Sequence, residues 1–134
     1  MLSDISKKAL NVARKNAKKL HADVAFIQSD LFEKINAKFD LITANPPYLT
    51  KGEYVSQNVN FEPKIALYAE NNGFAIIKKI LSDFPRCLNP GGYLILEISP
   101  THRELIKTNL PKGFKVEFHL DERENTRFAL ISEM

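Results

Sequence analysis

Residues 39–48 read Phe-Asp-Leu-Ile-Thr-Ala-Asn-Pro-Pro-Tyr, and this stretch decides the fold that we predict for the 134-residue chain. Its first six residues are mostly apolar or β-branched, which favours a strand of a sheet. Two prolines then follow Asn45, and because proline has no backbone N–H to give to a neighbouring strand, the chain must leave the sheet there. We therefore predict a strand over residues 39–44 that ends abruptly at the corner Asn45–Tyr48.

Strand-like and helix-like stretches alternate on both sides of this corner. The predicted strands are residues 1–3, 24–28, 39–44, 93–98, 115–120 and 127–132, and the predicted helices are residues 6–20, 72–88 and 101–109. This alternation predicts an α/β fold with a mostly parallel sheet, and the last two strands predict an antiparallel hairpin at the C-terminus. The Asn-Pro-Gly-Gly run at 89–92 predicts a turn before strand 93–98.

The composition is that of an ordinary globular domain, with 44% hydrophobic and 26% charged residues and a net charge of +3. A large share of the basic residues falls within the first predicted helix, at Lys7, Lys8, Arg14, Lys15, Lys18 and Lys19. No aromatic residues interleave with them, so this pattern favours a solvated helix face over a nucleic-acid surface. We expect no direct contact with nucleic acid.

The remaining chemistry-bearing residues exclude several classes of protein. Cys87 is the single cysteine, so no internal disulfide can form, and its helical spacing from Phe84 predicts a small core residue. His21, His102 and His119 lack the spacing of metal ligands, so we expect no metal. No apolar run reaches the length of a membrane span and no signal-peptide pattern occurs, so we expect a cytoplasmic protein without membrane contact.

The corner at Asn45–Tyr48 suits chemistry on a planar nitrogen. In open α/β sheets, ligands bind beyond the carboxyl ends of the strands, where this corner lies. An amide nitrogen is a poor nucleophile, because its lone pair is delocalised. The Asn45 side-chain oxygen and the Pro46 carbonyl can accept its two N–H groups and turn the lone pair toward an electrophile, while Tyr48 offers a flat face. A proline-rich turn without any function is the alternative interpretation.

The strand with Asn45-Pro46-Pro47-Tyr48 resembles the amino-group methyltransferases that use S-adenosyl-L-methionine. Further matching segments are Asp4-Ile5-Ser6, Gln28-Ser29-Asp30-Leu31-Phe32, Phe61-Glu62-Pro63, Leu88-Asn89-Pro90-Gly91-Gly92, Leu94-Ile95-Leu96-Glu97 and Arg127. The run Phe61-Glu62-Pro63 is the most discriminating, and it is similar to the release factor glutamine methyltransferase family. The resemblance covers essentially all 134 residues. It implies a Rossmann-like S-adenosylmethionine-dependent methyltransferase fold.

The resemblance also implies a reaction and a set of site residues. The reaction is methylation of the side-chain amide nitrogen, N5, of the glutamine in the Gly-Gly-Gln motif of a peptide chain release factor. Asp4 would bind the ribose hydroxyls of the cofactor, and Asp30 with the backbone of Leu31 would contact its adenine. Asn45 would lie between cofactor and substrate, with Asn45, Pro46 and Tyr48 as catalytic residues and Asn45, Pro46, Pro47 and Tyr48 clamping the glutamine. Alone, Asp4 or Asp30 could equally start a helix or a turn.

One departure from the family pattern concerns the methionine part of the cofactor. The family carries a glycine-rich loop after its first strand, whereas the first glycine of this chain is Gly52, after the corner. The first strand, its loop, the following helix and an N-terminal helical domain are not found in residues 1–134, which we interpret as a partial catalytic domain. We expect a fragment, a degraded gene, or half of a split protein whose separate partner chain supplies the N-terminal part. The chain alone is expected to be inactive.

Two other functions stay open from the sequence. Adenine N6 is also a planar amino nitrogen, so a nucleic-acid adenine methyltransferase would use the same corner on a flipped base. The missing glycine loop is also compatible with a non-catalytic remnant. The acidic pair Asp121 and Glu122 is expected to lie in an exposed turn.

Overall fold

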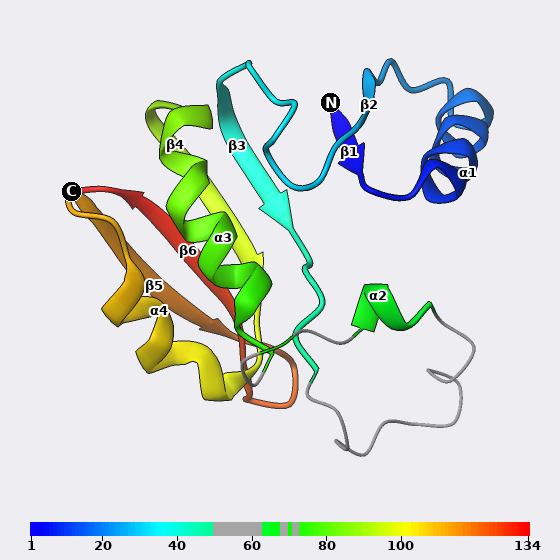
Figure 1. The fold of residues 1–134 in the computed structure, drawn as a ribbon. Coiled ribbons are helices and arrows are strands. Elements are labelled where there is room, and N and C mark those ends of the chain that lie inside the picture. The colour runs from blue at the N-terminus through cyan, green and yellow to red at the C-terminus, as the bar shows by residue number, and fades with distance from the viewer. Residues whose placement is uncertain (50–62, 68–69, 71–72) are drawn as a thin grey trace. The chain divides into compact units, whose positions relative to one another are not determined.

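The computed structural model describes residues 1–49, 63–67, 70 and 73–134 (Figure 1). The chain divides into two compact units, Met1–Ala37 and Lys38–Met134, and each is described by itself. Phe61 and Glu62, which carry part of the family resemblance, lie outside the described residues. No helix within the described part of the chain is both long enough and apolar enough to cross a membrane.

The unit Met1–Ala37 is a β-α-β arrangement. Strand β1 (Leu2–Asp4) pairs in parallel with β2 (Phe26–Gln28), and helix α1 (Lys7–Lys19) connects them. The helix begins where the sequence predicts, because the Ser6 hydroxyl accepts a hydrogen bond from the Ala9 backbone N–H at 3.2 Å and so caps the first turn. The basic side chains of α1 are all exposed, which confirms the predicted solvated face.

The unit Lys38–Met134 is built on a four-stranded sheet with the strand order β3-β4-β6-β5. Its strands are β3 (Phe39–Ala44), β4 (Leu88–Glu97), β5 (Phe114–Leu120) and β6 (Thr126–Glu133). β3 and β4 run parallel, and β6 pairs antiparallel with both β4 and β5. The predicted α/β class, with parallel neighbours and a C-terminal antiparallel hairpin, is therefore confirmed.

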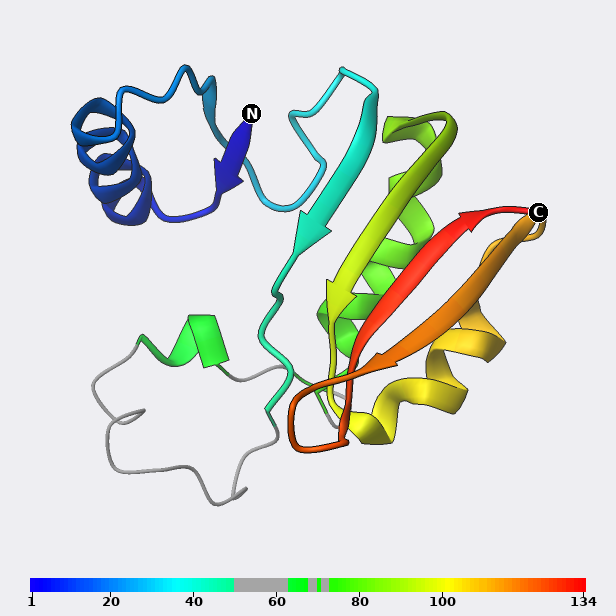
Figure 2. The same ribbon diagram turned by 180° about the vertical axis from the view of Figure 1, so that it is seen from behind.

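Among the described residues, the helical segments between these strands are α2 (Lys64–Leu67), α3 (Ala75–Asp83), η2 (Phe84–Cys87), η3 (Pro100–His102) and α4 (Arg103–Asn109). Figures 1 and 2, which view the molecule from opposite sides, show α3 and α4 on the same face of the sheet. The side chains of β4 alternate accordingly, because successive strand residues point to opposite faces. Leu94 and Leu96 are fully buried, whereas the Tyr93 between β3 and β6 is 46% exposed.

The core of this unit fills the space between α3, α4 and the sheet. Its fully buried apolar residues are Ile77, Ile80, Leu81, Phe84, Cys87, Leu94, Leu96, Ile98, Ile106, Ala129 and Ile131. The burial of Cys87 confirms its predicted place in the core. Packing in this layer fixes β4 and β6, which carry the side chains of the site described below.

The largest differences from the predicted boundaries concern two segments, whereas the strand predicted over 24–28 only begins two residues later, at Phe26. The helix predicted over 72–88 ends as an α-helix at Asp83 and continues as the 3-10 helix η2, because Pro85 has no N–H for an α-helical hydrogen bond. The turn predicted at 89–92 lies inside β4. Leu88 already pairs with Phe39, and the register then shifts before Leu41 pairs with Tyr93. Gly91, at φ +75°, lies in this irregular part of the strand, where the extra residues are accommodated as a bulge.

Candidate functional site

The corner Asn45–Tyr48 lies where the sequence predicts, at the carboxyl end of β3. β4 runs parallel to β3 with Ala44 opposite Leu96, so Asn45, directly after β3, and Glu97, the last residue of β4, lie at the same end of the two strands. In open α/β sheets, ligands bind beyond these carboxyl ends of the strands. The position of Asn45 at the edge follows directly from the strand register.

A depression of about 310 Å³ opens at this edge. Its lining residues are Thr43, Ala44, Asn45, Ile95, Glu97 and Phe128, which come from β3, β4, β6 and the start of the corner. Asn45 is exposed, so its carboxamide faces solvent rather than the packed core. The side chain that the sequence assigns to substrate therefore lines an accessible hollow.

The backbone of the corner is held from two sides. Pro46 is buried, and the Leu49 backbone N–H donates to the Leu67 carbonyl at 2.9 Å. Gly73, at φ +78°, packs against the Tyr48 backbone, where an added Cβ would overlap the Tyr48 carbonyl oxygen. Together with the fixed φ of the two prolines, these contacts give the corner one backbone conformation.

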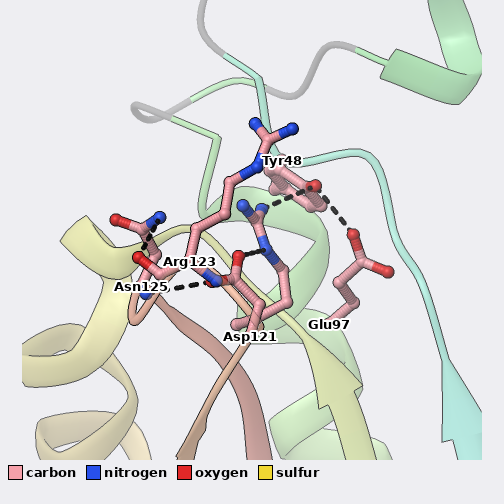
Figure 3. A network of polar contacts seen from close by, with 6 residues as sticks. Tyr48, Glu97, Asp121, Arg123 and Asn125 are labelled. Carbon is pink, nitrogen blue, oxygen red and sulfur yellow. Dashed lines mark hydrogen bonds and ion pairs between the residues drawn. The ribbon is translucent and has the colours of Figure 1, made fainter.

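A chain of polar contacts connects the corner to β4 and β6 (Figure 3). The Tyr48 hydroxyl donates to Glu97 Oε1 at 2.9 Å, and Arg127 Nη1 donates to the same hydroxyl at 3.3 Å. Arg127 Nε in turn donates to Asp121 Oδ2 at 3.2 Å. Burial, and then the hydrogen bond to the Glu97 carboxylate, raise the pKa of Tyr48 above its ordinary value.

The side chain of Asp121 is held by three hydrogen bonds, one from Arg127 and two from backbone N–H groups. Its Oδ1 accepts the backbone N–H groups of Arg123 at 2.9 Å and Asn125 at 3.0 Å (Figure 3). The hydrogen bond from Asn125 is the main reason why the pKa of this carboxyl is lowered. The residue does lie in a turn, as predicted, but its side chain is only 20% exposed, because it is held by these N–H groups and by Arg127.

The residues predicted to bind the cofactor lie in the other unit, at the carboxyl ends of two paired strands. Asp4 ends β1, and its backbone carbonyl accepts the Ser29 N–H at 3.2 Å, directly before Asp30. The Asp4 carboxylate accepts the Ser6 N–H at 2.7 Å through one oxygen. Leu31 has the left-handed φ of +45°, which sets the backbone direction after Asp30. Asp4, Asp30 and Leu31 are thus brought together locally, and their union with Asn45–Tyr48 in one site stays a prediction.

Sequence reasoning missed the roles of Glu97, Arg127 and Asp121. Glu97 and Arg127 belonged to the family resemblance, but no chemistry was assigned to them. The register rule could have found Glu97, because the carboxyl ends of neighbouring parallel strands meet at one edge. The contact of Arg127 with Tyr48 spans 79 positions and leaves no periodic signal in the sequence. Among the described residues, no group of three His, Cys, Asp or Glu side chains is arranged to hold a metal.

Comparison with known proteins identifies the family. Residues 1–127 match the methyltransferase domain family. The release factor glutamine methyltransferase of Lactococcus lactis subsp. lactis is 40% identical over 115 residues, which are 84% of this chain and 43% of that protein. The ribosomal protein uL3 glutamine methyltransferase of Xanthomonas campestris pv. campestris is 41% identical over 108 residues, which are 78% of this chain and 35% of that protein. The chain thus spans less than half the length of these two curated relatives.

A solved structure supports the same fold. The ribosomal protein L11 methylase of Lactobacillus delbrueckii subsp. bulgaricus superposes with a TM-score of 0.70 at 22% identity, covering 98% of this chain and 55% of that one. At this identity the likeness concerns the fold, which is the Rossmann-like methyltransferase fold expected from the sequence. The chain therefore belongs to the methyltransferase domain family, and its similarity places it with the release factor glutamine methyltransferases of that family.

Proposed function

We propose that the protein takes part in methylation of the side-chain amide nitrogen, N5, of a glutamine, with S-adenosyl-L-methionine as methyl donor. The proposed substrate is the Gly-Gly-Gln motif of a peptide chain release factor, which would be met in the cytoplasm. The observation that carries the proposal is the exposed Asn45 carboxamide on the wall of the depression at the carboxyl end of β3. The name of the Lactococcus lactis relative supports the choice of substrate.

The corner supplies acceptors for both N–H groups of a primary amide. The Asn45 side-chain oxygen accepts one, and the Pro46 carbonyl accepts the other. Because the prolines and Gly73 fix the backbone, both acceptors are in place before the substrate arrives, and little ordering is needed during the reaction. The amide plane is thereby turned so that the nitrogen lone pair faces the methyl group.

The chemistry required of the cofactor is an electrophilic methyl group on a positively charged sulfur. The lone pair of the amide nitrogen would take this methyl group, and the electron pair of the broken S–CH₃ bond would stay on sulfur. Positive charge grows on the nitrogen, where Asn45 and Pro46 stabilise it through their oxygen dipoles. The methylated amide cation is strongly acidic and loses its N–H proton to water, so no general base is assigned.

The adenosine half of the cofactor is assigned to the unit Met1–Ala37. Asp4 and Asp30 follow two parallel strands, and a carboxylate at such a strand end can accept from ribose hydroxyls. One oxygen of Asp4 is used by the Ser6 N–H, and the second stays available on the same carboxylate. Asp30 and the Leu31 backbone would contact adenine. No described residue is assigned to the methionine half, for which a separate N-terminal chain is the proposed source.

The proposal is tested by methyl transfer with defined substrates. The chain is incubated with labelled S-adenosylmethionine and a release factor domain, alone and with the N-terminal part of the Lactococcus lactis relative added as a separate polypeptide. Label is expected on the Gly-Gly-Gln glutamine and not on a domain with this glutamine changed to alanine. No label under either condition would overturn the proposal and favour a non-catalytic remnant.

Ribosomal protein uL3 is a second candidate substrate, because a uL3 glutamine methyltransferase is as similar to this chain as the release factor enzyme is. Both would present a glutamine amide to the same corner. The two are separated by offering equal amounts of each protein in one assay. Label on uL3 alone would replace the release factor in the proposal, and label on DNA or RNA alone would favour the adenine methyltransferase.

A further inference from the structure

Glu97 brings a carboxylate to the wall of the depression, where Asn45 also lies. Its hydrogen bond to Tyr48 uses Oε1, and Figure 3 shows the second carboxylate oxygen directed away from Tyr48. A glutamate carboxylate accepts hydrogen bonds and cannot donate them. Glu97 therefore adds a negative charge and a further acceptor to a hollow that already holds the Asn45 carboxamide.

The hydrogen bonds around Tyr48 restrain the position of the Glu97 carboxylate. A tyrosine has one O–H, which it gives to Glu97, so Arg127 must be the donor to the Tyr48 oxygen. Asp121 holds the other side of the guanidinium through Nε. Arg127, on β6, and Tyr48, after β3, are thus positioning residues that restrain the Glu97 carboxylate from the two sides of β4.

None of the six residues that line the depression carries a positive charge. A bound carboxylate would meet the negative charge of Glu97, and the nearby Arg127 is not a lining residue and is engaged by Tyr48 and Asp121. A primary amide of the same shape would offer two N–H groups to the acceptors of the wall. Such a site discriminates between a carboxylate, which it repels, and a primary amide, whose N–H groups it attracts.

We infer that Glu97 is a specificity-determining residue, which makes the depression accept a neutral carboxamide and reject the isosteric carboxylate. This inference rests on the proposed function and adds to it a reason why glutamine, and not glutamate, is the side chain that enters. Asn45 and Pro46 orient the amide, and Glu97 excludes the acid.

Two small probes test this inference without any methyl transfer. Propionamide represents the glutamine side chain, and propionate represents the glutamate side chain. The full chain, isotope-labelled for NMR, is titrated with each probe at neutral pH. Propionamide is expected to shift the Asn45 side-chain amide and the backbone signals of Asn45 and Glu97, whereas propionate should bind at least about tenfold more weakly.

Variants assign the discrimination to Glu97. Glu97→Gln keeps an acceptor for Tyr48 and removes the charge, so the difference between the probes is expected to fall about tenfold. Glu117→Gln removes the same charge from β5, outside the depression, and should leave the difference unchanged. Tyr48→Phe should reduce the difference partly, because Glu97 keeps its charge and loses its restraint.

Three results would overturn the inference. These are equal binding of both probes to the unchanged chain, an unchanged difference in Glu97→Gln, and no shift with either probe at tens of millimolar. The first and third need no variant, so misfolding of a variant cannot hide them. Failure of methyl transfer to any protein would instead overturn the proposed function and leave the measured discrimination standing.

Discussion

Gly73 lies against the backbone of Tyr48 so closely that a Cβ on Gly73 would overlap the Tyr48 carbonyl oxygen. The contact joins the segment before α3 to the corner that holds the proposed acceptor site. Its φ of +78° is also a conformation that residues with a Cβ rarely adopt. The two constraints act on one residue, and they explain why a glycine stands there.

Gly73→Ala is expected to destabilise the chain by more than about 1 kcal/mol, because the backbone must move away from Tyr48 as well as bear the positive φ. Urea denaturation measures the change. Gly113→Ala is the matched control, since Gly113 has φ +87° and open space around its Cβ position. Equal losses in the two variants would mean that the contact with Tyr48 has no energetic weight.

The ionisation of Tyr48 provides a second prediction. Burial and the hydrogen bond to Glu97 raise its pKa above the ordinary value of about 10. A raised pKa in the folded state means that the neutral phenol stabilises the fold below about pH 10, and that this stabilisation is lost as the pH rises through the raised pKa. The difference in tyrosinate absorbance between the unchanged chain and Tyr48→Phe should therefore titrate above pH 10.

Glu97→Gln should lower the pKa of Tyr48 toward its ordinary value, because the carboxylate repels a phenolate and is a stronger hydrogen-bond acceptor for the phenol than a neutral amide is. The same absorbance titration measures this shift. An unchanged titration in Glu97→Gln would contradict the influence of the Glu97 charge on Tyr48.

The parts of this site that could be predicted depend on residues close together in the sequence, and the parts that could not depend on residues far apart in it. The corner and its strand were predicted correctly because two prolines after a run of apolar residues leave few alternatives, and β3 has the predicted bounds. The start of the first helix at Ser6 was equally local, because the Ser6 hydroxyl caps the helix through a residue three positions on. The Arg127–Tyr48–Glu97 contacts join three separate elements, and neither periodicity nor composition reports which side chains meet across a sheet.

The two wrong boundaries also have local physical causes. Pro85 ended the α-helical part of the segment earlier than its apolar period suggested. Asn89, Pro90, Gly91 and Gly92 have the composition of a turn, yet they continue β4, because a bulge next to an edge strand tolerates proline and glycine. Turn propensity alone could not show that a partner strand continues alongside.

Two neighbouring substitutions test which face of β4 packs against the helices. Leu94 is fully buried beneath α3 and α4, so Leu94→Ala should destabilise the fold by about 2–5 kcal/mol. Tyr93 is 46% exposed on the other face, so Tyr93→Ala should cost clearly less. Thermal or urea unfolding compares the two. A larger loss in Tyr93→Ala would show that the helices cover the opposite face.

Cys87 is fully buried, and its burial raises the pKa of the thiol. Thiolate is the reactive form, so both effects slow its reaction with a disulfide reagent. At pH 8, the native chain should react at least about a hundredfold more slowly than the chain in urea. A thiol that reacts at the same rate in both states would place Cys87 outside the core.

The most direct test of the central claim is the rate at which label from S-adenosylmethionine reaches the release factor glutamine in the Asn45→Ala variant. The N-terminal part is supplied as a separate chain, and Asn16→Ala, an exposed asparagine of α1, serves as the control. Loss of one positioned acceptor should lower the rate about a hundredfold to a thousandfold, while Asn16→Ala keeps the rate of the unchanged chain. An Asn45→Ala variant that methylates this glutamine at the unchanged rate would contradict the assignment of the corner as the acceptor site.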